Sequence, residues 1–501
     1  MKKYIFTTLA AITLLSIVTT SCSDEFVNPA PEYSIDSENY FNSKEEYDNA
    51  LIAAYDLLQS TYVNVLLGEI ASDNTLAGGE SPTDVIGFQQ IDDMIHTQTN
   101  SNLRDIWNWM FAGVQRANYI LEFQNKTDFE GKTQLIAETR FLRAYYQFEL
   151  VKWFGGIPMK PDARFVLGDE LKIPRSSVAE VYASIEADLT FAAANLSPTA
   201  SQKGRATKGA AFALLGKAYL YQDKFTQAAT ALQSVIDLGT YSLKTGNDYT
   251  NLFELSGENG TESVFEVQYT DVEGAGFPCL QCSEGNVAVG FSGVRGYSGP
   301  FFSAGFSFNI PTAESANAFE SGDKRKDVSI LDINAWAEAN ANYDNGNGIK
   351  FGKGNEDTGF FNRKYLPRTR SKEAAGDLNL TNPNNYRAIR YADVLLMAAE
   401  AYNRGGINDV KAREYLNQVR RRAFGDNTHD IFVSGAALTD LILKERRLEL
   451  FGEGHRFFDL VRTGNAEGTI PGFTADKNEL FPLPIEEIQF ANGNWAQNPG
   501  Y

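Results

Sequence analysis

Apolar residues recur every three or four positions along most of the chain, which is the period of an amphipathic α-helix. This pattern predicts helices over residues 44–59, 102–124, 132–153 and about 178–195. Ser43, with Glu46 three residues later, is typical of a capping box at the start of the first helix. Gly155-Gly156 and Pro158 indicate the end of the third. The pattern therefore favours a mainly α fold.

Two segments show a sharper pattern, that of a tetratricopeptide repeat, in which two helices pack as a hairpin. In residues 206–238, the small residues Gly216 and Ala228 would let the paired helices approach, while larger residues fill the space between them. A weaker copy covers residues 387–424. Any amphipathic helical hairpin is the alternative, and two matches in one chain favour a tetratricopeptide-like repeat scaffold. The matching positions are Phe212, Leu215, Gly216, Tyr219, Ala228 and Leu232, then Leu395, Ala399, Tyr402, Ala412 and Leu416.

Residues 271–385 lack this periodicity and are interpreted as a loop-rich insertion between repeat helices. The part from 271 to 364 holds 14 of the 42 glycines together with 13 aromatic residues. Long irregular segments of this kind are usually functional, so we predict the ligand-binding region here. Helical regions over 36–270 and 386–501 flank it. The second of these ends in a tail from Leu480 to Tyr501 that we expect to be extended.

The first 21 residues have the features of a secretory signal peptide. Two lysines precede a mostly apolar run from Ile5 to Val18, which is too short to span a bilayer. Thr19-Thr20-Ser21-Cys22 follows and is typical of a bacterial lipobox, although leucine is more usual at Thr19. We predict cleavage before Cys22 and lipidation of its thiol, with residues 22–35 as a tether. An ordinary signal peptide followed by an incidental cysteine is the alternative.

The amino-acid composition argues against two classes of function, nucleic-acid binding and electrostatic docking on a membrane. The 501 residues carry 45 Lys and Arg against 64 Asp and Glu, a net charge of −19 that becomes −21 once the signal peptide is removed. Such an acidic chain is a poor candidate for nucleic-acid binding, because phosphates need clustered basic residues. It is equally unsuited to electrostatic docking on an anionic membrane. Hydrophobic residues make up 43 %, enough for a large core.

Two acidic or cysteine-containing patterns could carry chemistry. Glu445, Glu449 and Glu453 recur every four residues and share one helical face, where paired carboxylates could act on a glycoside. Arginines surround them, which favours ion pairs instead. Cys279 and Cys282 have the spacing of a redox or zinc half-site, but there is no second pair and the three histidines are scattered. A local disulfide is the favoured interpretation, and no metal or cofactor is predicted.

Aromatic residues in loops are the better candidates for binding, because flat rings stack on the C–H faces of sugars. Trp336, Tyr343 and Tyr297 are predicted to contact a ligand, since they lie in the Gly-rich segment. Asp73-Asn74, in a polar loop, and Arg368, in a basic cluster at 363–372, are predicted to hydrogen-bond it. Helix capping and a solvated charge-balancing loop are the respective alternatives. The remaining tryptophans are interpreted as packing residues: Trp107, Trp109, Trp153 and Trp495.

Several ordered motifs stand out across nearly the whole mature chain. They are Asn100–Asn108, Arg140–Tyr146, Trp153–Pro158, Arg390–Leu396, Glu445–Gly452, His455–Leu460, Leu483–Ile488 and Gln497–Tyr501. Together they resemble the SusD/RagB family of Bacteroidetes outer-membrane lipoproteins. The acidic Ser23-Asp24-Glu25 after the lipobox resembles the surface-export signal of such lipoproteins.

The resemblance implies a non-catalytic lipoprotein on a tetratricopeptide-like scaffold, anchored in the outer membrane at the cell surface. It further implies a partner, a TonB-dependent SusC-like transporter, to which the lipoprotein delivers captured oligosaccharides as a hinged lid. In such a protein the helix of Glu445, Glu449 and Glu453 is structural. Peptide capture, as in some relatives, and a glycoside hydrolase using Glu445 or Glu449 are the alternatives to glycan capture.

Overall fold

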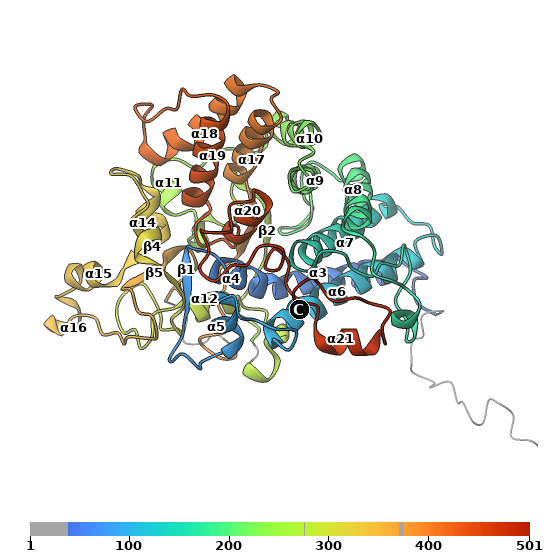
Figure 1. The fold of residues 1–501 in the computed structure, drawn as a ribbon, viewed down its shortest axis with the longest axis horizontal. Helices are drawn as coiled ribbons and strands as arrows, with labels where there is room; N and C mark the ends of the chain where they lie inside the picture. The colour runs from blue at the N-terminus through green and yellow to red at the C-terminus, as the bar shows by residue number, and fades with distance from the viewer. Residues whose placement is uncertain (1–38, 275, 370–374) are drawn as a thin grey trace, which may run out of the picture.

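The computed structural model describes residues 39–274, 276–369 and 375–501. The predicted signal peptide 1–21, the lipidation site Cys22 and the tether 22–35 lie outside these residues. Within them the chain is mainly helical, and most of the long helices lie side by side in the upper and right parts of Figure 1. A smaller region built of short helices and strands, α14 to α16 with β4 and β5, projects on the left. The prediction of a mainly α fold is confirmed.

The long helices form where the periodicity predicts them. Ser43 accepts a hydrogen bond from the backbone of Glu46 and so caps the first helix, while the carboxylate of Glu46 turns to the backbone N–H of Asn42. The complete capping box is at Ser177 and Glu180 instead. The principal helices are α3 (Lys44–Asp56), α4 (Tyr62–Ile70), α6 (Ser101–Glu122), α7 (Lys132–Phe154), α8 (Val178–Asn195), α9 (Lys208–Leu220), α10 (Phe225–Asp237), α17 (Tyr391–Arg404), α18 (Asp409–Phe424) and α19 (Ala436–Glu449).

The two tetratricopeptide-like segments are helical hairpins, α9 with α10 and α17 with α18, and α10 packs on α17. Gly216 is the point of close approach in the first hairpin. A Cβ atom placed there would lie 2.5 Å from Cγ of Leu232, closer than carbon atoms can approach without displacement. Ala399 and Ala412 are fully buried in the second hairpin. Small residues therefore set the spacing of the stacked helices, as the sequence pattern indicates.

The run Lys44–Ile70 has the length and apolar composition of a membrane-crossing helix, and 61 % of its most apolar window is buried inside the protein. It is not one continuous α-helix, because a 3-10 segment, η1 (Leu57–Thr61), separates α3 from α4. The run packs against α6, α7 and α12 (Val287–Ser292). Its apolar side chains thus belong to the main core.

Three short antiparallel strand pairs connect residues 271–385 to the rest of the chain, flank them or lie within them. β1 (Thr75–Gly78) pairs with β3 (Phe308–Pro311), and β2 (Ser263–Val267) pairs with β6 (Tyr386–Arg390). A third pair, β4 (Ile330–Asp332) with β5 (Phe360–Asn362), has Leu331 opposite Phe361. The other short elements are α5 (Ile86–Asp92), η2 (Asp169–Leu171), α11 (Gly246–Thr250), η3 (Leu255–Gly257), η4 (Phe277–Cys282), α13 (Ala313–Ala316), α14 (Arg325–Ser329), α15 (Ile333–Ala339), α16 (Tyr343–Gly346), η5 (Arg363–Tyr365), α20 (Arg456–Arg462) and α21 (Ile485–Phe490).

The loop-rich segment has a small hydrophobic core of its own, separate from the core of the helices. Trp336, Ile349 and Phe351 pack against its edge. Other buried residues of the segment, among them Val287, Phe291 and Tyr365, belong to the core of the helices and attach the segment to it. The buried residues of this small core are Val294, Tyr297, Phe302, Ile310, Leu331, Ile333, Phe361 and Leu366.

The C-terminal tail departs from the expected extended form. Helix α21 begins directly after Pro484, whose φ of −56° suits a helix start. Beyond it, Trp495 donates from its indole Nε1 to the carbonyl of Ile173 at 2.8 Å. The amide of Asn498 donates to the carbonyls of Phe154 and Phe481. The tail thus closes over the ends of α7 and of the loop that follows it.

Glu445, Glu449 and Glu453 are buried, and each is paired with two cations at 2.6–3.0 Å. Burial alone would raise the pKa of Glu449, but the surrounding cations outweigh it and hold the pKa at about 2. These carboxylates are committed to structure, as the surrounding arginines suggest. Their partners are Arg325 and Arg420 for Glu445, Arg390 and Arg422 for Glu449, and Lys364 and Arg390 for Glu453.

We predict that Glu449→Gln lowers the free energy of unfolding by about 3–5 kcal/mol at pH 7, because it leaves buried cations without their partner. The pKa of Glu449 lies below its ordinary value in the folded state. Its contribution is therefore complete above about pH 4.5 and is lost as the pH falls toward 2. Urea unfolding followed by circular dichroism at pH 7, 4 and 3 should show the gap between variant and wild type narrowing. The exposed Glu467→Gln is the control, and equal destabilisation by both would contradict the prediction.

Candidate functional site

Three of the residues predicted to contact a ligand meet in the loop-rich segment. Trp336 lies on α15, Tyr343 begins α16, and Tyr297 follows α12. The indole Nε1 of Trp336 donates to the hydroxyl of Tyr297 at 2.9 Å, and that hydroxyl donates to the carbonyl of Pro300 at 2.7 Å. Burial raises the pKa of Tyr297, and the neighbouring Tyr343 raises it further. The phenol therefore stays neutral and serves to fix the ring of Trp336.

The aromatic contacts continue from Trp336 through Phe302 to Phe301. The ring centroids of Trp336 and Phe302 are 5.5 Å apart, and those of Phe302 and Phe301 are 4.9 Å apart, both in edge-on geometry. Phe301 and Tyr343 are 45 % and 39 % exposed, a large fraction for aromatic side chains. We call the set Tyr297, Phe301, Phe302, Trp336 and Tyr343 the loop aromatic face.

Phe301 belongs to this face, although the sequence patterns do not single it out. Its backbone φ is +71°, a conformation that a bulky residue adopts only under constraint. Such strain concentrates at functional positions. The Gly299-Pro300 turn before it was the available sequence signal. The backbone is held by Thr369, whose N–H donates to the carbonyl of Phe301 at 2.9 Å.

Arg368 lies behind this face, and its predicted role as a ligand contact is corrected. Its guanidinium donates to both carboxylate oxygens of Glu254, at 2.7 and 2.9 Å, and to the backbone carbonyls of Leu366 and Arg363. It lies 5.6 Å from the ring centroid of Phe301, within the range of a cation–π contact. Because its side chain is buried and donates four hydrogen bonds to protein groups, Arg368 supports the ring of Phe301 instead of contacting a ligand.

The predicted role of Asp73 and Asn74 as ligand contacts is also corrected, because both side chains form contacts inside the protein. Asp73 pairs with Arg456 at 2.7 Å and with Arg447 at 3.0 Å. Asn74 is fully buried, donates to Glu69 and accepts from Arg447. The two residues connect the end of α4 to α19 and α20, so they are not available to a ligand in this conformation.

The remaining sequence candidates have simple structural positions. Cys279 and Cys282 are joined by a disulfide in η4, as their spacing and surroundings predict. Among the described residues, no group of three or more His, Cys, Asp and Glu side chains is arranged to hold a metal ion.

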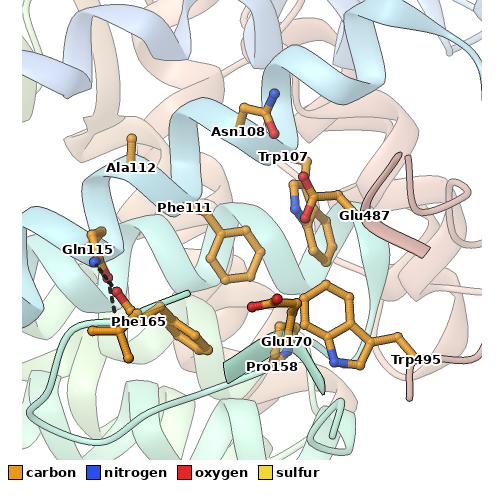
Figure 2. A pocket seen from close by; sticks show the side chains of 11 residues that line it. Trp107, Asn108, Phe111, Ala112, Gln115, Pro158, Phe165, Glu170, Glu487 and Trp495 are labelled. Carbon is orange, nitrogen blue, oxygen red and sulfur yellow. Dashed lines mark hydrogen bonds between the residues drawn. The ribbon is translucent and has the colours of Figure 1, made fainter. Parts of the chain in front are cut away.

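A second aromatic surface lies elsewhere in the fold, in a cavity of about 430 Å³ that we call the aromatic cleft. Figure 2 shows the rings of Phe111, Trp107 and Trp495 around it, with the carboxylates of Glu170 and Glu487 among them. Trp107 and Trp495 are buried, in agreement with their interpretation as packing residues, yet both line the cleft. The lining is Trp107, Asn108, Phe111, Ala112, Gln115, Pro158, Phe165, Val166, Glu170, Glu487 and Trp495.

Comparisons with family models match most of the chain in two parts. Residues 25–220 match the model described as starch-binding associating with outer membrane, and residues 244–478 match the SusD family. A SusD-like protein of Formosa agariphila is 28 % identical over the full length of both chains.

Solved structures agree with this result. Surface glycan-binding protein A from Bacteroides thetaiotaomicron, in complex with laminarihexaose, is 26 % identical, covers 91 % of this chain and 99 % of its own, and has a TM-score of 0.78. A laminarin-binding SusD-like protein is 34 % identical over 92 % of this chain and 100 % of its own, with a TM-score of 0.82. With sequence and architecture matched over almost the whole length, this chain belongs to the SusD family.

Proposed function

We propose that this protein captures neutral oligosaccharides at the cell surface through the loop aromatic face, without catalysis. The exposed rings of Phe301 and Tyr343, in the same segment as the fixed indole of Trp336, are the observation that carries the proposal. Two relatives of the same architecture support the ligand class, since one is named for laminarin and the other was solved with laminarihexaose. The negative net charge also fits a neutral ligand better than an anionic one.

The chemistry of the face suits weak and reversible capture. Rings present flat apolar surface to the C–H faces of sugars, and each stacking contact is worth about 1–3 kcal/mol by analogy with base stacking. Two or three such contacts give affinities from about micromolar to millimolar. Because the rings are fixed before the ligand arrives, little conformational entropy is lost on binding.

The proposal includes anchoring and delivery. Lipidation of Cys22 would attach the protein to the outer membrane, and a TonB-dependent SusC-like transporter would receive the captured glycan. The family model described as associating with the outer membrane supports this location. A hydrolase based on Glu445 or Glu449 is disfavoured, since both carboxylates are held in buried ion pairs.

We expect Tyr343→Ala and Phe301→Ala each to weaken binding of laminarihexaose about tenfold, the loss of roughly 1.4 kcal/mol from one ring. Isothermal titration calorimetry would measure the affinity, and thermal unfolding should show an almost unchanged Tm. Phe432→Ala is the matched control, because Phe432 is an exposed ring outside the loop aromatic face. Wild-type affinity in both folded variants would contradict the placement of the site, and binding of peptides with no response to glycans would contradict the ligand class.

Trp336→Ala and Trp153→Ala should separate binding from stability. Trp153 is fully buried between the rings of Phe458 and Phe481, so its removal should cost about 3–5 kcal/mol of folding free energy. Trp336 lies at the edge of the small core, so Trp336→Ala should reduce glycan affinity more than it reduces the stability of the helices. Urea unfolding and calorimetry on both variants would check this. The prediction is wrong if folded Trp336→Ala protein binds as tightly as wild type.

A further inference from the structure

The aromatic cleft is built from three separate parts of the chain. One face of α6 supplies Trp107, Phe111 and Ala112, while the loop after α7 and the C-terminal tail supply the opposite wall. Trp107 packs on Phe111 with ring centroids 4.6 Å apart, and on Trp495 at 6.3 Å. The volume of about 430 Å³ falls within the range of roughly 300–1,000 Å³ typical of small-ligand sites. The cavity is therefore suited to a small ligand.

The wall of the cleft is held in place by hydrogen bonds that use its own polar groups. Gln115 clamps Phe165, since its amide donates to the carbonyl of Phe165 and accepts from the N–H of Phe165, both at 2.8 Å. Trp495 is fixed by its bond to Ile173. Val166 at the mouth is 58 % exposed and the adjacent Leu167 is 99 % exposed. A ligand at the opening would bury part of these exposed apolar side chains.

The two carboxylates in the lining of the cleft, those of Glu170 and Glu487, favour a ligand that donates hydrogen bonds. Burial raises the pKa of the Glu487 carboxyl, a hydrogen bond from the side chain of Trp107 partly opposes this, and Glu486 and Glu170 add to the rise. The nearby Arg104 is paired with Glu486 instead. Glu170 accepts from the N–H of Gly168 at 2.8 Å. Within the described part of the chain, neither Glu170 nor Glu487 forms an ion pair.

We propose that the aromatic cleft is a second saccharide-binding site, which takes an uncharged sugar unit stacked on the partly exposed rings of Phe111 and Phe165, beside the almost fully buried Trp107 and Trp495. Its hydroxyls donate to Glu170 and Glu487, and the exposed amide of Asn108 lies within the same lining. Two carboxylates without cations repel uronic or sulfated sugars. The ligand class rests on the proposed function of the protein, whereas the position of the site rests on the cleft alone.

The two surfaces lie on different sides of the molecule. In Figure 1 the loop aromatic face belongs to the region of α15 and α16 on the left, while α6 and α21 lie to the right of centre. Two weak sites on one protein raise the effective concentration of a long polymer at the second site after the first has bound. A polysaccharide is therefore retained better than a short oligosaccharide.

The test uses the five tryptophans as reporters. The mature protein is labelled with 5-fluorotryptophan, its signals are assigned by Trp→Phe variants, and laminarihexaose is titrated by fluorine NMR. We expect signals of Trp107 and Trp495 to shift with one affinity and that of Trp336 to shift independently. Ala112→Phe, which fills the cleft, should weaken the first response at least tenfold and leave the second within twofold of wild type. Ala194→Phe, at an exposed alanine of α8, is the matched control.

The outcomes separate the two proposals. A shift of Trp336 alone overturns the second site and leaves the proposed function standing. Shifts of Trp107 and Trp495 alone, abolished by Ala112→Phe, support the cleft and overturn the loop aromatic face as the glycan site. No shift of any tryptophan overturns both. Tetramethylammonium chloride is titrated in parallel, and a response of the cleft to this cation with none to laminarihexaose overturns the assignment to a saccharide.

Discussion

Buried ion pairs centred on Arg390 join the two flanking helical regions to each other and to the loop-rich segment. Arg390, at the end of β6, contacts Glu262, Glu449 and Glu453, which come from the segment before β2 and from the region of α19. Lys364 from the loop-rich segment joins Glu453 at 2.7 Å. Charges taken out of water are costly unless each is matched, so the helices and the loop-rich segment can pack in only those positions where every partner is met. The position of the loop-rich segment, and with it that of the loop aromatic face, follows from the need to match these buried charges.

A second buried network serves the adjoining helices in the same way. Arg446 pairs with Asp393 and Asp459, and Arg462 pairs with Asp459 and Glu400. Together the two networks explain why α17, α18, α19 and α20 carry so many charged residues on faces that turn inward. The four-residue spacing of Glu445, Glu449 and Glu453, which could be mistaken for a catalytic pattern, serves these ion pairs. Their joint requirement is geometric, because every charge must reach its partner.

The sequence predicts most of the helices, because their apolar positions follow a local period that neighbouring residues reveal. The stacking at Gly216 and the disulfide at Cys279 and Cys282 are likewise local. Asp73 and Asn74 could not be interpreted correctly from sequence, because their partners Arg447 and Arg456 lie more than 370 residues away. Phe301 depends on a backbone angle that its neighbours impose only in the folded chain. The aromatic cleft combines one helix face, one loop and the tail, so no single stretch of sequence contains its pattern.

The loop aromatic face rests on a small core that is separate from the core of the helices, and this separation has an evolutionary consequence. Substitutions around Val294, Leu331 and Phe361 would therefore affect the packing under the outer rings before that of the stacked hairpins. Selection for a different glycan could therefore act on this small core and the rings that it carries, while the ion pairs that fix the scaffold stay untouched. Proteins with this architecture can therefore change their ligand specificity with little loss of stability.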